Sequence, residues 1–273
     1  MSYIELSNLS FYYRKGKALF DNISLTFNLG EQVGIIGRNG AGKTTLVKLL
    51  IGMLKPQKGT ISIEGSSIKN KSIADVATKV GFVFQNPNQM LFTNTVEKEL
   101  ELSLMRFELS KEVKQSQVNK ILDFFDMDEL RTMHPRNLSR GEKQKLALAT
   151  VLVQEPQAII LDEPFSGIDM TQRLLIVKYL NELKKQGKLI ILVSHNLDLI
   201  LETTDKIIAL KEGKVAYNMS IVQFFQNSEH LKEIGLIQTD YLSMLKSLKK
   251  FGLPNEILKK DDLLNFYKES LKI

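Results

Sequence analysis

A glycine-rich run, GRNGAGKT at residues 37 to 44, fills every position of the pattern G-x4-G-K-[ST]. In this pattern the glycines let successive backbone N–H groups converge on phosphate oxygens, and the lysine adds a point charge for the β and γ phosphates. Lys43 supplies that charge here, and the Thr44 hydroxyl suits Mg²⁺. An apolar strand precedes the run and a helix follows it, so a helix dipole also favours phosphate.

The run therefore predicts a site for a nucleotide and Mg²⁺. A chance flexible loop is the alternative, and the flanking strand and helix argue against it. The residues of this stretch that we expect to contact the nucleotide are Gly37, Asn39, Gly40, Ala41, Gly42, Lys43, Thr44 and Thr45.

Two carboxylates follow a second apolar strand. The segment AIILDE ends with Asp162 and Glu163, and a carboxylate at the C-terminal end of such a strand faces the crevice in which parallel sheets bind ligands. Asp162 suits the shell of a Mg²⁺ ion, and Glu163 is placed to polarise a water molecule. An ordinary acidic strand end would be the preferred interpretation if no complete phosphate loop accompanied it.

Two more apolar strands end in polar side chains that have a catalytic and an ordinary interpretation. LIILVSH ends with His195, and a lone histidine is usually a surface or structural residue, although this position favours a contact near the γ-phosphate. VGFVFQN ends with Gln85, which is either a turn residue or a member of the Mg²⁺ and water network.

An aromatic pair follows the first predicted strand. Tyr12 and Tyr13 either pack in the core or offer a platform for adenine, and stacking of a base on an aromatic ring contributes ~1–3 kcal/mol.

The segment LSRGE at residues 138 to 142 also has two interpretations. Ser139 and Glu142 have the spacing of a helix capping box, in which the two side chains bond to each other's backbone N–H groups. The same serine and Gly141 could instead hold a phosphate. The local pattern is compatible with both uses.

The elements that must position these residues indicate an α/β fold. Apolar strands that alternate with helices are typical of a mostly parallel sheet covered on both faces. A polar helical block interrupts the pattern, and the composition shifts again beyond residue 219. We expect strands within 3–13, 22–28, 32–37, 59–65, 80–84, 157–164, 188–195, 205–210 and 213–218, and helices within 43–54 (ending near Lys55), 171–187, 240–252 and 261–271.

Composition narrows the classes of protein. The chain has no cysteine, which excludes disulfides and thiolate metal sites, and 43% hydrophobic residues suffice for a sizeable core. No apolar run approaches the ~18 residues that span a bilayer, and the N-terminus lacks the pattern of a signal peptide. The net charge of +6 would suit nucleic acid or an anionic membrane, but the basic residues are scattered, which favours a solvated surface.

Over residues 2 to 217 the chain resembles the ATP-binding-cassette (ABC) ATPase family. The resemblance rests on five motifs in one order: GRNGAGKT, VFQN, LSRGE, IILDEP with SGID, and LVSH. The resemblance implies ATP and Mg²⁺ as ligands, with Lys43 and Thr44 in the Walker A loop. It further implies a RecA-like core, an antiparallel β subdomain and an inserted helical subdomain at about 90–155. We expect an ATPase domain over 1–218 and a C-terminal helical extension over 219–273 that contributes to dimerisation.

The family resemblance also assigns roles to single residues. It makes Glu163 the catalytic glutamate, His195 the switch histidine and Asp162 the Walker B aspartate. Gln85 becomes the Q-loop glutamine and a metal contact, and Tyr13 the aromatic that stacks on adenine. Ser139 and Gly141 fall in the signature motif, which in this family faces the Walker A loop of a second subunit, and Asp169 in the D-loop. The signature departs from the usual pattern at Arg140 and Glu142, which raises the possibility of an asymmetric pair.

A finer resemblance links the chain to ATPases of energy-coupling-factor (ECF) transporters. QNPNQMLFTNTVEKEL is similar to their Q-loop stretch, although Met90 and Asn94 depart from it, and residues 231–267 are similar to their C-terminal extension. This implies uptake of vitamins or of cobalt or nickel through a membrane scaffold subunit and a substrate-binding subunit. The expected location is the cytoplasmic face of the membrane, bound peripherally.

Two other functions stay open at this point. The chain could serve another ABC importer or an exporter. It could also be a soluble ABC protein that acts on nucleic acid or ribosomes, although those types usually carry two cassettes or a long coiled-coil insertion; no direct contact with nucleic acid is therefore expected.

Overall fold

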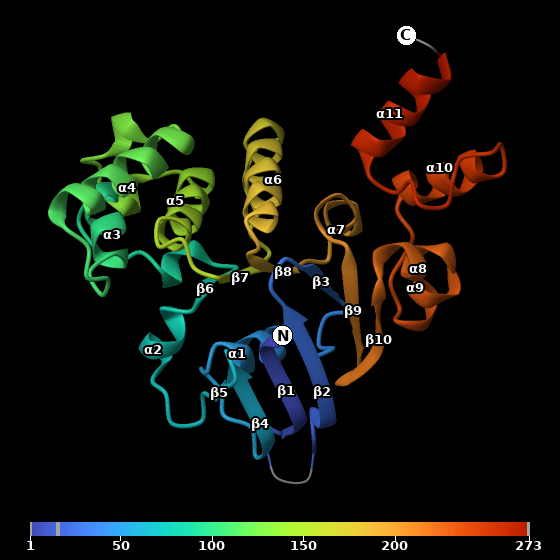
Figure 1. The fold of residues 1–273 in the computed structure, drawn as a ribbon, viewed down its shortest axis with the longest axis horizontal. Coiled ribbons are helices and arrows are strands. Elements are labelled where there is room, and N and C mark those ends of the chain that lie inside the picture. Colours follow the sequence, from blue (N-terminus) through green and yellow to red (C-terminus); the bar gives the residue numbers. More distant parts are fainter. Residues whose placement is uncertain (1, 15–16, 272–273) are drawn as a thin grey trace.

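The computed structural model describes residues 2–14 and 17–271, and its centre is a six-stranded sheet in the order β10-β9-β3-β8-β7-β6 (Figure 1). Strands β9, β3, β8, β7 and β6 run parallel, and β10 adds an antiparallel edge. The bounds are β3 Gln32–Ile36, β6 Val80–Val83, β7 Ala158–Asp162, β8 Leu189–Val193, β9 Lys206–Lys211 and β10 Lys214–Ser220. The predicted hairpin between the last two strands is confirmed, with Glu212 and Gly213 both at positive φ in its turn.

A second, antiparallel sheet has the order β2-β1-β4-β5 and packs over the phosphate-loop helix (Figure 1). Its strands are β1 Ser2–Phe11, β2 Phe20–Asn28, β4 Lys58–Ile63 and β5 Ser66–Ser67. The central sheet is covered on both faces, and successive side chains along each strand point to opposite faces. In β7, Ile159 and Leu161 join the core under the helices, whereas Ile160 joins the core shared with the antiparallel sheet.

Helices cover the central sheet and extend from its two ends. Their bounds are α1 Lys43–Leu50, α2 Ile73–Ala77, α3 Val96–Ser103, α4 Lys111–Phe124, α5 Arg140–Leu152, α6 Met170–Lys185 and α7 Leu197–Thr203, with short 3-10 turns at Pro87–Gln89, Asp128–Leu130 and Pro135–Asn137. Figure 1 shows α3, α4 and α5 grouped beyond the β6 edge.

The phosphate-loop helix is shorter than the sequence predicted. We expected it to continue to about Lys55, but α1 ends at Leu50. Gly52 adopts a left-handed φ of 73° and its N–H bonds to the carbonyl of Leu49, which ends the helix as glycine commonly does. The proline at position 56 therefore comes after the stop and does not cause it.

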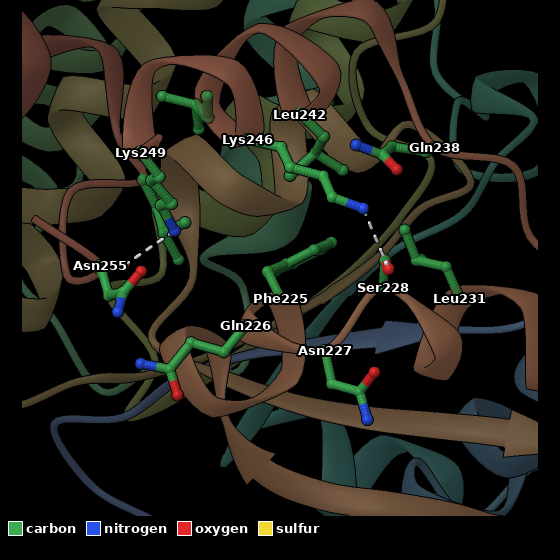
Figure 2. Close-up of a pocket in the computed structure, with 12 residues that line it drawn as sticks. Phe225, Gln226, Asn227, Ser228, Leu231, Gln238, Leu242, Lys246, Lys249 and Asn255 are labelled. Atoms are coloured by element: carbon green, nitrogen blue, oxygen red, sulfur yellow. Dashed lines mark hydrogen bonds between the residues drawn. The ribbon is translucent and has the colours of Figure 1, made fainter. Parts of the chain in front are cut away.

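Four helices follow β10 on the opposite side of the molecule from α3–α5 (Figure 1). They are α8 Ile221–Gln226, α9 Glu229–Glu233, α10 Asp240–Lys249 and α11 Lys260–Leu271. In α10, Leu242 and Leu245 are buried, whereas Met244 is 42% exposed. A small cavity of about 80 Å³ lies between α8, α9 and α10 (Figure 2). Within the described residues, we find no helix with both the length and the apolarity that a membrane crossing requires.

Candidate nucleotide site

The carboxyl ends of four adjacent parallel strands bring the predicted polar residues to one edge of the central sheet. Gly37 directly follows β3, His195 lies two residues beyond β8, Asp162 ends β7, and Gln85 lies two residues beyond β6. These residues and the phosphate loop line one cavity of about 940 Å³, within the range of ligand sites. Of the described residues predicted to hold nucleotide or metal, Ala41, Ser139 and Gly141 do not line this cavity.

The phosphate loop is held close to the neighbouring strand. A Cβ at Gly37 would lie 2.4 Å from the carbonyl oxygen of Leu210, so only glycine fits this position. The Lys43 ammonium donates to the carbonyls of Gly37 at 2.6 Å and Arg38 at 3.1 Å, which holds it above the loop. Burial lowers the pKa of Lys43, and the carboxylates of Glu163 and Asp162 oppose that shift. Ala41 is buried in the hydrophobic core that the central sheet shares with the antiparallel sheet.

Tyr13 lies at the side of the cavity where its ring is accessible. It is 63% exposed, its ring packs in a T-shaped arrangement with that of Phe11, and its hydroxyl is 3.0 Å from the Thr45 hydroxyl. The hydrogen bond fixes the ring beside the first turn of α1. This placement fits the predicted adenine platform better than core packing.

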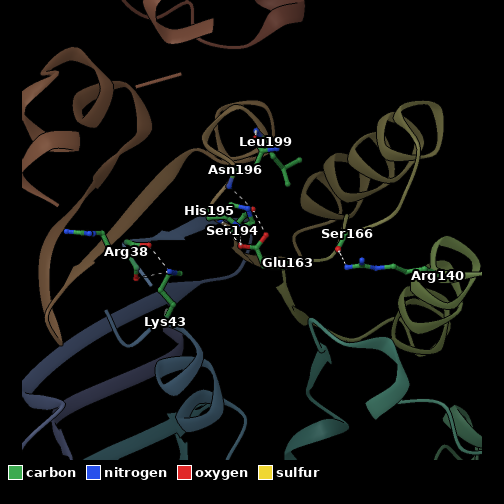
Figure 3. Close-up of polar contacts among 10 residues, drawn as sticks. Arg38, Lys43, Arg140, Glu163, Ser166, Ser194, His195, Asn196 and Leu199 are labelled. Carbon is green, nitrogen blue, oxygen red and sulfur yellow. Dashed lines mark hydrogen bonds and ion pairs between the residues drawn. The ribbon is translucent and has the colours of Figure 1, made fainter. Parts of the chain in front are cut away.

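Glu163 and His195 form a hydrogen-bonded pair. One Glu163 carboxylate oxygen accepts from the His195 backbone N–H at 2.7 Å and lies 2.6 Å from the ring Nδ1, while the other accepts from the Ser194 hydroxyl at 2.9 Å. A carboxylate has about four lone-pair positions, so one remains for a water molecule. Glu163 also has a positive φ of 49°, which is uncommon for a non-glycine residue, and its side chain lies against Ser194 and His195 just beyond β8 (Figure 3).

Asp162 is a nearly buried carboxylate beside Glu163. Burial and the Glu163 charge raise the pKa of Asp162 from 3.8 to about 6, and Lys43 and Lys48 oppose the shift. A cation bound nearby would stabilise the charged form of a carboxylate in this environment. Asp162, the Thr44 hydroxyl and the Gln85 amide oxygen line the same cavity and are hard oxygen donors of the type that Mg²⁺ prefers together with phosphates and water. The donor set therefore fits the predicted metal.

Because the pKa of Asp162 is raised on folding, removing the carboxylate charge should stabilise the protein at neutral pH. We expect Asp162→Asn to raise the free energy of unfolding at pH 7 by up to ~3 kcal/mol, at ~1.4 kcal/mol per pH unit, because the pKa rises from 3.8 to about 6 on folding. Below pH 3.8 the carboxyl is protonated in both states, so the two proteins should converge in stability as the pH falls from 7 to below 4. Urea unfolding at several pH values measures this, and a constant difference would contradict it.

The LSRGE segment starts helix α5 as a complete capping box. The Ser139 hydroxyl accepts from the Glu142 N–H at 3.3 Å, and the Glu142 carboxylate accepts from the Ser139 N–H at 2.7 Å. Interactions of the Glu142 carboxylate with the Ser139 hydroxyl and backbone N–H hold the pKa of Glu142 below its usual range, so Glu142 is an anion turned back onto its own helix. The capping interpretation is thus confirmed for the isolated chain.

Arg140 connects this helix start to the segment after the two carboxylates. Its guanidinium donates to the Ser166 hydroxyl at 2.6 Å, apart from the Glu163–His195 pair (Figure 3). A Cβ at Gly141 would lie 2.7 Å from the Gly167 carbonyl oxygen, so the two segments are in direct contact. Arg140 and Gly141 therefore hold the SGID segment of their own chain.

The capping box predicts a structural cost for changing Ser139. We expect Ser139→Ala to lower the free energy of unfolding by about 0.5–2 kcal/mol, because the first N–H groups of α5 lose their acceptor. Ser139→Asn should keep the stability, since asparagine caps helices about as well as serine. Urea unfolding compares the three proteins. Equal stability of the wild type and the alanine variant would show that the cap contributes nothing.

The fold and the site together define a P-loop nucleotide-hydrolysing protein, with a phosphate loop after β3 and a carboxylate pair at the end of β7. The family model "ABC transporter" matches residues 20–166, and the chain belongs to the ABC transporter ATP-binding family. It is an ATP-binding subunit and an ATPase of an ABC transporter.

Three comparisons illustrate the relationship. A putative ABC transporter ATP-binding protein of Pyrococcus horikoshii is 36% identical over 90% of this chain and 93% of its own length. An energy-coupling factor transporter ATP-binding protein of Methanococcus maripaludis is 36% identical over 86% of each chain. The structure of cbiO1 from Clostridium perfringens, part of the ABC transporter complex cbiONQ, superimposes with a TM-score of 0.74 at 29% identity, covering 90% of this chain and 99% of that one.

The structure adds residues that the sequence patterns did not single out. Ser194 donates to Glu163, and Arg38 lies between the predicted loop contacts. Gly235, Leu236, Ile237 and Thr239 line the same cavity from the C-terminal part of the chain. Ser194 precedes the predicted His195 in LVSH, so the sequence did indicate this region. The C-terminal segment carries no such indication in its sequence, because nothing in its composition is typical of a nucleotide site.

Proposed function

We propose that this chain is the ATP-hydrolysing subunit of an ECF-type importer that takes up a vitamin, cobalt, nickel or another micronutrient through separate membrane subunits. The similarity to the Methanococcus maripaludis ECF protein and to cbiO1, and the Q-loop stretch QNPNQMLFTNTVEKEL, support the subgroup. The substrate is selected by another chain. The expected location is the cytoplasmic face of the membrane, without a membrane crossing by this chain.

The observation that carries the proposal is an apolar groove whose lining residue Phe84 directly precedes Gln85 of the nucleotide cavity. A hollow of about 330 Å³ lies between the Q-loop stretch, α2 and α3. It is lined by apolar side chains, among them Met53, Ile73, Phe84, Met90, Phe92 and Leu102. Phe92 is 75% exposed, and an exposed apolar cluster of this type marks a contact with a partner.

The groove is held in shape by a buried carboxylate. Glu99 is fully buried and accepts hydrogen bonds from the backbone N–H groups of Phe92 and Thr93. Met90 accepts from the Phe84 N–H through its sulfur at 3.4 Å. The same stretch starts at Gln85, which lines the nucleotide cavity. We infer that movement of Gln85 with the nucleotide is passed along residues 85–92 to a membrane subunit seated in the groove.

A second cassette completes the proposed site. Ser139 and Gly141 lie outside the nucleotide cavity of their own chain, so they reach a phosphate only on a second subunit, either identical or a paralogue. The exposed position of Ser139 at the start of α5 suits such a contact. Arg140 would then bring a cation that offsets the Glu142 charge near the phosphates.

Purification from membranes tests the proposal. A tagged chain extracted in mild detergent is expected to bring down a polytopic scaffold subunit and a small substrate-binding membrane protein. Phe92→Ser should reduce this recovery strongly, because it removes the most exposed apolar side chain of the groove, whereas Leu174→Ser on α6 outside the groove should not. Recovery of an exporter-type membrane protein would contradict the ECF assignment.

A further inference from the structure

The segment Gly235–Thr239, between α9 and α10, forms one side of the nucleotide cavity. Gly235, Leu236, Ile237 and Thr239 line that cavity together with the phosphate loop, although they lie about 200 residues away along the chain. Gln238 faces the other way and lines the small cavity between α8, α9 and α10 (Figure 2). The segment is therefore a thin wall between the two hollows.

Hydrogen bonds fix both ends of this wall. At its start, the Gly235 N–H bonds to the Lys232 carbonyl at 2.9 Å and the Leu236 N–H to the Leu231 carbonyl at 2.8 Å, which closes α9. At its end, the Thr239 hydroxyl donates to Asp198 at 2.5 Å. Asp198 lies in the first turn of α7, which begins two residues after His195. The wall is thus attached to the element that follows the switch histidine.

Arg38 of the phosphate loop packs directly on the wall. A Cβ at Gly235 would lie 2.4 Å from Arg38 Cδ and 3.3 Å from its Cγ and Nε, so the arginine stem rests on the glycine backbone. Arg38 extends away from Lys43 and Glu163 in Figure 3, while its carbonyl accepts from the Lys43 ammonium. The wall therefore holds the one cation of GRNGAGKT other than Lys43.

We propose that Gly235–Thr239 is a working wall of the ATP site and that Gly235 is a positioning residue for Arg38. Arg38 lines the nucleotide cavity, and its guanidinium has to turn back toward Lys43 to meet a phosphate. An arginine whose stem is already ordered loses less side-chain entropy in this turn. The C-terminal extension thereby contributes to nucleotide affinity within each chain, apart from any part in dimerisation. The inference rests on ATP binding at the phosphate loop and is independent of the ECF assignment.

ATP titration of the full-length chain by calorimetry tests the wall. Gly235→Ala and Arg38→Ala should each weaken ATP binding by about tenfold, the scale of one charge-assisted contact. The double variant should bind no more weakly than Arg38→Ala, because both changes remove the same contact. Gly252→Ala is the matched control, since this glycine of the extension also has positive φ but no atom within 4 Å of the added Cβ.

The outcomes separate the wall from nucleotide binding itself. A wild type that binds no ATP would overturn both proposals. A wild type that binds ATP, with Gly235→Ala unchanged or with additive losses in the double variant, would overturn the wall alone. If Gly235→Ala does not fold, Arg38→Lys and Arg38→Ala still decide. If the positioned guanidinium binds the nucleotide, lysine should restore less than half of the affinity lost in Arg38→Ala. If the side chain contributes only the packing of its stem, lysine should restore the affinity in full, which would overturn the wall.

Discussion

Glu163→Gln is expected to lower the rate of ATP hydrolysis by about 10²- to 10⁴-fold while ATP affinity changes little. The glutamine side chain keeps the shape of glutamate and can still accept from Ser194 or His195 through its carbonyl oxygen. It cannot polarise the attacking water, because it is a far weaker base than a carboxylate. Phosphoryl transfer depends mainly on positioning and charge stabilisation, so the bound nucleotide should remain in place while turnover fails.

The measurement is single-turnover hydrolysis in the purified, dimerised complex, with ATP binding recorded in parallel. Glu212→Gln provides the matched control, because Glu212 has the same positive φ of 49° in the β9–β10 turn. Unchanged turnover in Glu163→Gln would remove Glu163 from the catalytic step. A loss of ATP binding together with turnover would instead assign Glu163 to the shape of the site.

Lys43→Ala is expected to weaken ATP binding by roughly 10- to 100-fold, as the loss of ~1.5–3 kcal/mol from hydrogen bonds to a charged group predicts. Lys43 is the ammonium held above the phosphate loop by the Gly37 and Arg38 carbonyls. It also lowers the pKa of the neighbouring Asp162, so its removal should raise that pKa further and weaken Mg²⁺ binding at neutral pH.

Equilibrium binding of ATP with and without Mg²⁺ measures both effects. Lys48→Ala is the control for the phosphate contact, because Lys48 lies on the same helix and also lowers the pKa of Asp162 but lies outside the nucleotide cavity. Lys43→Ala should lose more ATP affinity in the presence of Mg²⁺ than in its absence, since the metal site is also weakened. Equal affinities of wild type and Lys43→Ala would contradict the phosphate role of the loop.

Most of the fold was predictable because its elements have local signals. The strand that precedes GRNGAGKT, the strand that ends in Asp162 and the strand that ends two residues before His195 are continuous apolar runs, which indicate burial on both faces of a parallel sheet. The predicted end of α1 near Lys55 is wrong, because Gly52 in a left-handed conformation ends the helix before Pro56 is reached. The dimerisation role of the extension and the domain boundary near residue 218 stay predictions.

Sequence alone determined the chemical groups of this protein: a phosphate loop with Lys43 and Thr44, a carboxylate pair, a histidine and a glutamine, each at the end of an apolar strand. It could do so because each motif is a local spacing that fixes backbone geometry over a few residues. Only the tertiary structure decided that Glu163 bonds to His195, that Arg140 bonds to Ser166, and that Gly235 supports Arg38. Those contacts join segments that are far apart along the chain, and their geometry follows from sheet order and packing, which no short motif encodes.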